Sequence, residues 1–158
     1  MDEYENLLNE YSKEVDIVET NLFEKVGLYG VYRNGIIFLE HSLNITEKKE
    51  ILIEEYNHFQ KTVGIILDEN LIDNAKQENL ARRLTYERLL PLESIINCYY
   101  DGLIYYHEVA DHLSISEALL IEAVNYYKAT MGIVFHFRNY MIVFGNTITV
   151  QKKELRSV

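Results

Sequence analysis

The chain lacks the features that mark secreted and membrane-inserted proteins. It has one cysteine, Cys98, and therefore no possible internal disulfide, as is usual for proteins of a reducing compartment. No apolar run exceeds five residues, whereas a bilayer span needs about 20. The acidic start MDEYENL also lacks the pattern of a signal peptide. These absences predict a cytoplasmic protein that does not associate with a membrane.

Positive charge is scarce as well. The 158 residues carry 25 Asp and Glu against 15 Lys and Arg, which gives a formal net charge of -10. The excess lies in residues 1–101, with 20 acids against 10 Lys and Arg, whereas residues 102–158 are balanced. Because an acidic surface repels phosphate, direct nucleic-acid binding is not expected.

Most of the sequence shows the apolar periodicity of amphipathic helices. The expected helices cover residues 1–14, 46–62, 74–90, 92–100, 104–112 and 116–131. Thr46 is the expected N-cap of the second helix, and Ser116 or Ser114 that of the last. Gly64 and Gly132 are expected to end these two helices.

Two short hairpins complete the expected secondary structure. Asn34-Gly35, within residues 27–40, is a strong hairpin-turn signal, and a second hairpin is expected to turn near Arg138-Asn139. The last dozen residues are polar and are expected to fray. The sequence thus predicts an α+β fold: a mainly helical core over residues 1–102, then helices and a hairpin over residues 103–158, packed with the core as one domain.

The last elements follow the order of a winged helix-turn-helix: helix, short turn, helix and hairpin. A DNA reader of this kind needs basic and amide side chains on its second helix. Here Glu117 and Glu122 stand near the start of that helix, and only Lys128 is basic. We therefore interpret this part as structural, or as a contact surface for a protein partner.

The segment ILIEEYNHFQ, residues 51–60, is similar to the zinc-peptidase helix signature HExxH, with glutamate in place of the first histidine. Residues four apart lie on one face of a helix, so Glu54 and His58 can reach a common ion. Glu55 keeps the position of the general base that activates water in HExxH enzymes. The spacing therefore predicts a metal site with one altered ligand.

A solvated acidic helix face is the common alternative for a Glu-Glu pair. The helical wheel argues against it, because Glu55 and His58 fall on the shoulder of an apolar stripe, where a carboxylate is costly without a partner. The stripe consists of Leu52, Tyr56, Phe59 and Val63. Glu78, on the next expected helix, is the candidate third ligand. Ala81 and Thr85 follow on its face and would let the two helices approach closely.

Four segments in order resemble the ImmA/IrrE family of metallopeptidases, in its short form from phages and integrative elements of Gram-positive bacteria. The segments are GLYGVYRNGIIFLE, ITEKKEILIEEYNHFQKTVG, KQENLARRLTYERLLPLESI and YYHEVADHLSISEALLIEAVNYY, and the similarity covers about residues 15–130. The resemblance implies a zincin-like core and a zinc-dependent endopeptidase. Glu55 matches the general base, His58 the second ligand and Glu78 the glutamate ligand, while Glu54 occupies the position of the first ligand.

The resemblance also implies a partner. Short members are similar to anti-repressors that cleave the helix-turn-helix immunity repressor of their own mobile element. A carboxylate at Glu54 is an acceptable zinc ligand, but two carboxylates cancel the charge of a divalent ion and weaken it as a Lewis acid. Manganese, a harder metal, is an alternative occupant. Two hypotheses stay open: a peptidase with a weakened metal site, and a metal-free relative that binds and inactivates the repressor without cutting it.

Overall fold

The computed structural model describes residues 2–66 and 74–153, without the side chains at 63–66, 74, 75, 77 and 78. The chain divides into two compact units, residues 1–85 and 86–158. This division falls within a helix and precedes the boundary expected after residue 102. The reason is that the helix at residues 92–100 packs against elements of the second unit.

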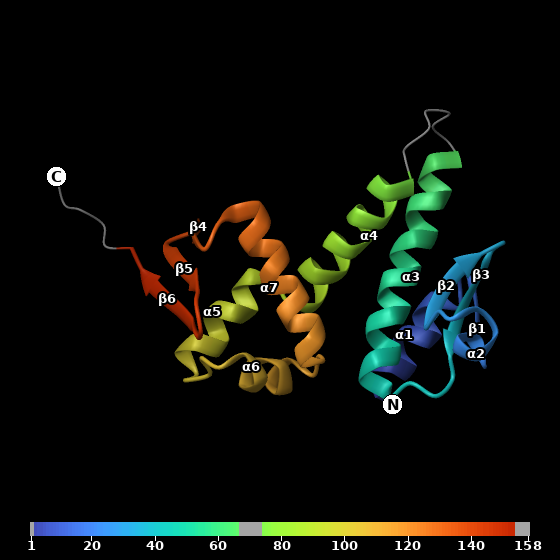
Figure 1. The fold of residues 1–158 in the computed structure, drawn as a ribbon, viewed down its shortest axis with the longest axis horizontal. Coiled ribbons are helices and arrows are strands. Elements are labelled where there is room, and N and C mark those ends of the chain that lie inside the picture. Colours follow the sequence, from blue (N-terminus) through green and yellow to red (C-terminus); the bar gives the residue numbers. More distant parts are fainter. Residues whose placement is uncertain (1, 67–73, 154–158) are drawn as a thin grey trace. The chain divides into compact units, whose positions relative to one another are not determined.

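The N-terminal unit combines helices with a small sheet (Figure 1). Its elements are α1 (Glu3–Tyr11), β1 (Asp16–Thr20), α2 (Leu22–Val26), β2 (Gly30–Arg33), β3 (Ile36–Glu40), α3 (Ile45–Ile66) and most of α4 (Asn74–Leu89). The strand order is β1-β3-β2, with β1 parallel and β2 antiparallel to the central β3. Ile37 and Leu39 of β3 are fully buried, and α3 packs against β2, β3 and α1.

The hairpin predicted at Asn34-Gly35 is confirmed. Both residues have positive φ, 53° and 80°, which is the conformation that a two-residue type I′ turn requires. The sequence prediction missed β1 and α2. Strand β1 is five residues long with no regular alternation of burial, and it is defined by parallel pairing with β3, which is distant in sequence.

The start and end of α3 differ from the prediction. Asn44 caps the helix: its side-chain Oδ1 accepts from the Glu47 backbone N–H at 2.8 Å, and Glu47 Oε2 lies 3.4 Å from the Asn44 backbone nitrogen. The N-cap prediction for Thr46 is wrong because Asn44 and Glu47 together form the reciprocal pair of a capping box. The helix also continues past Gly64 to Ile66, since one glycine costs a helix only about 1 kcal/mol.

The C-terminal unit packs helices against a three-stranded antiparallel sheet. Its elements are α5 (Leu92–Tyr100), α6 (Tyr106–Leu113), α7 (Glu117–Met131), β4 (Val134–Phe137), β5 (Tyr140–Phe144) and β6 (Ile148–Lys152). Ser116 caps α7 and Gly132 ends it at φ 90°, as predicted. The expectation that the last dozen residues fray is wrong for β6, because Ile148 and Val150 are buried against the core.

The structure is thus an α+β fold, as predicted. In the second unit, α6, a short turn, α7 and the strands follow the order expected for a winged helix-turn-helix. Within residues 2–66 and 74–153, no helix combines the length and apolar character that a bilayer crossing requires.

Candidate metal centre

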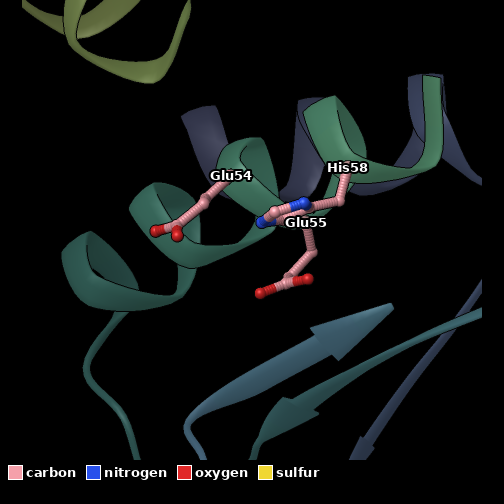
Figure 2. A group of neighbouring side chains, drawn as sticks. All are labelled: Glu54, Glu55 and His58. Carbon is pink, nitrogen blue, oxygen red and sulfur yellow. The ribbon is translucent and has the colours of Figure 1, made fainter. Parts of the chain in front are cut away.

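Three chemically suitable side chains meet on one face of α3. Glu54, Glu55 and His58 each offer one ligand atom, and these atoms all lie within 4.8 Å of one another. Figure 2 shows the His58 ring extending back along the helix toward Glu54, while the Glu55 carboxylate points toward the sheet. No comparable group of three His, Cys, Asp or Glu occurs elsewhere in the described ranges. The helical spacing therefore brings Glu54, Glu55 and His58 together, as the sequence predicts.

The burial of α3 agrees with the predicted wheel at two of its four apolar positions. Leu52 is fully buried and Tyr56 is 8% exposed, whereas Glu54, Glu55 and His58 are partly buried. Phe59 is also partly buried, and the side chain of Val63 lies outside the described part of the structure. The three polar side chains therefore lie at the edge of the buried stripe and not on the opposite, solvated face. At such an edge, a carboxylate is stabilised by an opposite charge more strongly than it would be in open water.

Contacts with α1 fix the position of α3. The ring of Tyr11 stacks on that of Tyr56 with centroids 3.6 Å apart, and the Tyr56 hydroxyl donates a hydrogen bond to Glu14. Burial, followed by this hydrogen bond, raises the pKa of Tyr56 to about 12. One turn before the site, the buried Lys49 ammonium lies 3.1 Å from a Glu3 carboxylate oxygen. These contacts hold the face that carries Glu54, Glu55 and His58 in a fixed orientation.

Strand β2 approaches the site closely at Gly30. A Cβ placed on Gly30 would lie 2.2 Å from Ile51 Cγ2 and 3.2 Å from Glu55 Cγ. Only glycine allows this approach, since no Cβ contact as short as the first occurs without displacing its neighbour. Gly30 begins β2, which is the edge strand of its sheet. The Glu55 side chain therefore lies against the first residue of this edge strand.

Helix α4 reaches α3 on another side of the site. Ala81 and Thr85 are buried, and the Asn57 side-chain amide donates to the Thr85 hydroxyl oxygen at 3.1 Å. The two helices are thus in contact at Thr85, whereas the close approach predicted beside Glu78 stays a prediction. On the same helix, Arg82 Nε lies 3.9 Å from Glu54 Oε1. A guanidinium therefore already contributes positive charge at the first ligand position.

The third predicted ligand is not tested by these contacts. Glu78 belongs to α4, but its side chain lies outside the described part of the structure. Its assignment as a ligand stays a prediction. The arrangement does place α4, which carries Glu78 one turn before Arg82, against the helix of the other candidate ligands.

The donor set suits a divalent cation. Two carboxylates and an imidazole are ligands that both zinc and manganese accept. Two atoms bound at about 2.1 Å from one ion are at most about 4.2 Å apart, so small side-chain rotations would bring atoms now within 4.8 Å into range. Glu55, expected as a base, lies close enough to act as a ligand as well.

Two neighbours of the site were not found by sequence reasoning. Arg82 carried a usable signal, because it follows Glu78 by four residues on a predicted helix and so lies on the same face. Gly30 carried a weaker one, as a glycine that opens a β-rich run. Neither signal indicates which residue of α3 would be contacted.

No family model, curated protein or solved structure was found to match this chain. The resemblance to ImmA/IrrE peptidases therefore stays a prediction that rests on the four sequence segments.

Proposed function

We propose that the chain is a metal-dependent endopeptidase whose centre lies on α3. The observation that carries the proposal is the convergence of Glu54, Glu55 and His58, with ligand atoms within 4.8 Å at the partly buried edge of a core helix. A divalent cation, zinc or alternatively manganese, supplies Lewis acidity when bound at such a site. Side chains of this chain carry out the remaining parts of the proposed reaction, which are metal binding and proton transfer.

Each residue has a separate role in the proposal. Glu54 and His58 bind the ion, and Glu78 of α4 completes the ligand set. The Glu55 carboxylate accepts a proton from the attacking water and returns it to the leaving amine. In a zincin-like arrangement, the positions of these residues on the helix determine their roles. Glu54 and His58 are four residues apart on one face and can bind the same ion, whereas Glu55 is offset from them around the axis and can act on the water.

The neighbourhood of Glu55 supports a polypeptide substrate. Strand β2 pairs with β3 on one side only within the described residues, and its first residue, Gly30, adjoins Glu55. An open strand edge presents backbone N–H and C=O groups with which an extended peptide can pair. A peptide aligned in this way would pass next to the proposed base.

The proposed substrate is the helix-turn-helix repressor of the mobile element that encodes the chain. This part of the proposal is supported by the resemblance of four ordered segments to anti-repressor peptidases of the ImmA/IrrE family. Cleavage would inactivate the repressor and so release the genes that it controls.

A second function is favoured by one specific contact. Because the Arg82 guanidinium lies 3.9 Å from the Glu54 carboxylate, the acidic cluster has a cationic neighbour even without a metal. A metal-free relative would use the same surface to bind and inactivate the repressor without cutting it. The two functions share the partner and differ in the role of Glu55.

The deciding experiment is incubation of the purified chain with the repressor, with and without chelator, followed by mass spectrometry of the fragments. The peptidase should give discrete fragments that chelator prevents. Glu55→Gln should abolish cleavage and still form the complex, whereas Glu10→Gln, an exposed acid on α1, should cleave as the wild type does. Full anti-repressor activity of Glu55→Gln would refute the peptidase and leave the metal-free function.

A further inference from the structure

The C-terminal unit contains a small pocket lined by residues of α4, α5, α7 and β4. We call it the α5–α7 pocket. It measures about 310 Å³, which is at the lower end of the range of ligand pockets, about 300–1,000 Å³. Its lining includes three aromatic side chains, two carboxylates and one thioether: Tyr126, Tyr127, Phe137, Glu87, Glu93 and Met131. The pocket therefore has room for one long side chain.

Aromatic rings form the buried part of the pocket. Tyr127 is 3% exposed, and its hydroxyl donates a hydrogen bond to the Leu90 carbonyl oxygen at 2.8 Å. The ring of Tyr126 packs against those of Tyr127 and Tyr86, with centroid distances of 5.4 and 5.6 Å. Because these contacts fix the rings before a ligand arrives, the aromatic wall is pre-organised for binding.

The charged residues that line the pocket are all acidic. Glu87 and Glu93 are exposed and lie at its mouth. Arg88 and Lys128 each follow a lining residue along the chain but do not line the pocket themselves. Burial, followed by the charge of Glu87, raises the pKa of Tyr127, in agreement with a carboxylate close to the buried rings. The electrostatic potential at the pocket itself therefore favours a cation.

The helix ends around the pocket add to this potential. Glu87 lies in the last turn of α4, and Met131 is the last residue of α7. The C-terminal turn of a helix carries partial negative charge. The N-terminal turn of α5, which contains Glu93, contributes the opposite sign. Two C-terminal turns and two carboxylates outweigh this single N-terminal turn.

The chain already places a guanidinium at the edge of the pocket. Arg138 lies over the Phe137 ring, with Cζ 5.0 Å from the ring centroid, and its Nη1 lies 3.6 Å from Glu93 Oε1. An aromatic face next to a carboxylate suits a planar guanidinium better than a compact ammonium. Both side chains of this ion pair are 63% exposed, so the pair is weak and a second guanidinium can compete with it.

We propose that the α5–α7 pocket binds the arginine side chain of a protein partner. The guanidinium stacks on the aromatic wall and pairs with a carboxylate at the mouth. Free arginine fits less well, because Glu87 and Glu93 repel its α-carboxylate, a charge that an arginine within a polypeptide lacks. All lining residues belong to the unit of residues 86–158, so this proposal does not rest on the proposed function of α3.

NMR titration of the isotope-labelled full-length chain, in buffer with chelator, tests the proposal. The probes are short blocked alanine peptides that differ only in a central Arg, Lys, citrulline or Glu. Citrulline has the shape of arginine without its charge. The Arg peptide should bind most tightly, the Lys peptide more weakly, and the citrulline and Glu peptides least. Amide shifts should change at Glu93 and Phe137 beside the pocket, and not at Glu54 or His58 of α3.

Variants of the pocket should change this affinity in opposite directions. Glu87→Gln and Tyr126→Leu should each weaken binding of the Arg peptide about three- to fivefold, as expected for one exposed charge pair or one cation–π contact. Arg138→Gln should strengthen binding, because it removes the competing guanidinium. Glu117→Gln is the matched control, since it removes the same charge from an exposed position at the other end of α7. It should bind as the wild type does.

Equal affinity for the Arg and citrulline peptides would overturn the proposal, as would tighter binding of the Glu peptide. Unchanged binding by Glu87→Gln would also overturn it, and this exposed position keeps the test valid even if Tyr126→Leu does not fold. Free arginine that binds as tightly as the Arg peptide would overturn the protein partner and assign the pocket to a small molecule. Because cleavage is not measured, refutation of the peptidase would leave each of these outcomes unchanged.

Discussion

Replacing Arg82 by glutamine should tighten metal binding at the α3 centre. Arg82 Nε lies 3.9 Å from Glu54 Oε1, and the two side chains are 59% and 33% exposed. An ion pair this accessible to water contributes about 0.2–1 kcal/mol, which a metal must offset when it takes over the Glu54 oxygen. The variant no longer makes this competing contact.

Repulsion adds to the competition. An ion bound about 2 Å from the Glu54 oxygen would lie about 6 Å from the guanidinium. A doubly charged cation at that distance from a single positive charge is destabilised by about 1.4 kcal/mol in water, and by about half as much at physiological salt. With the competing pair included, Arg82→Gln should gain about 1–2 kcal/mol, or about five- to thirtyfold in Kd.

Competition against a chromophoric chelator, with zinc and with manganese, measures this change at fixed ionic strength. The gain should shrink as salt rises, because part of it is long-range repulsion. Arg83→Gln makes the same change in net charge one residue further along α4 and about 100° around its axis, so its effect should be smaller. If Arg82→Gln binds metal no more tightly than the wild type does, then Arg82 does not compete with a metal ion for Glu54, and the prediction is refuted.

Three further predictions concern the frame of the site. Gly30→Ala places a Cβ 2.2 Å from Ile51 Cγ2 and should destabilise the chain by about 1–3 kcal/mol in urea unfolding; in an Ile51→Ala background the same change should cost much less. Glu40, with its pKa lowered from 4.5 to about 2, stabilises the fold fully above pH 4.5 and loses that effect as the pH falls toward 2, so Glu40→Gln should show a weaker loss of stability in acid. Asn44→Ala should cost about 1 kcal/mol, whereas Thr46→Ala should be nearly neutral; equal losses would contradict the assigned cap.

Local chemistry made several features of the fold predictable. Asn34-Gly35 indicated a hairpin because few other residue pairs adopt two successive positive φ angles at low cost. The capping box at Asn44 was also present in the sequence, as an Asn followed three residues later by Glu47. Thr46 lacked the acid at the corresponding position, and that mismatch was the usable signal.

Features that depend on distant partners were not predictable in this way. Strand β1 pairs in parallel with β3 and has no regular alternation of burial of its own. Strand β6 is a different case, because it pairs with β5, the strand directly before it. The alternation of Ile148 and Val150 with polar residues was a usable signal for β6, which the prediction of a fraying terminus overlooked. The same distinction holds for the site. Glu54, Glu55 and His58 share one helix and followed from spacing alone, whereas Gly30 and Arg82 are brought to them by tertiary packing.

The metal content of the purified chain tests the central claim most directly. After loading with zinc or manganese and removal of excess ion, elemental analysis should find about one ion per wild-type chain, the occupancy expected of a single site. His58→Ala should lose this ion while retaining its helical circular dichroism, and His136→Ala, at an exposed position of β4, should keep it. Absence of bound metal in the wild type under every loading condition, or its full retention in His58→Ala, would contradict a metal centre on α3.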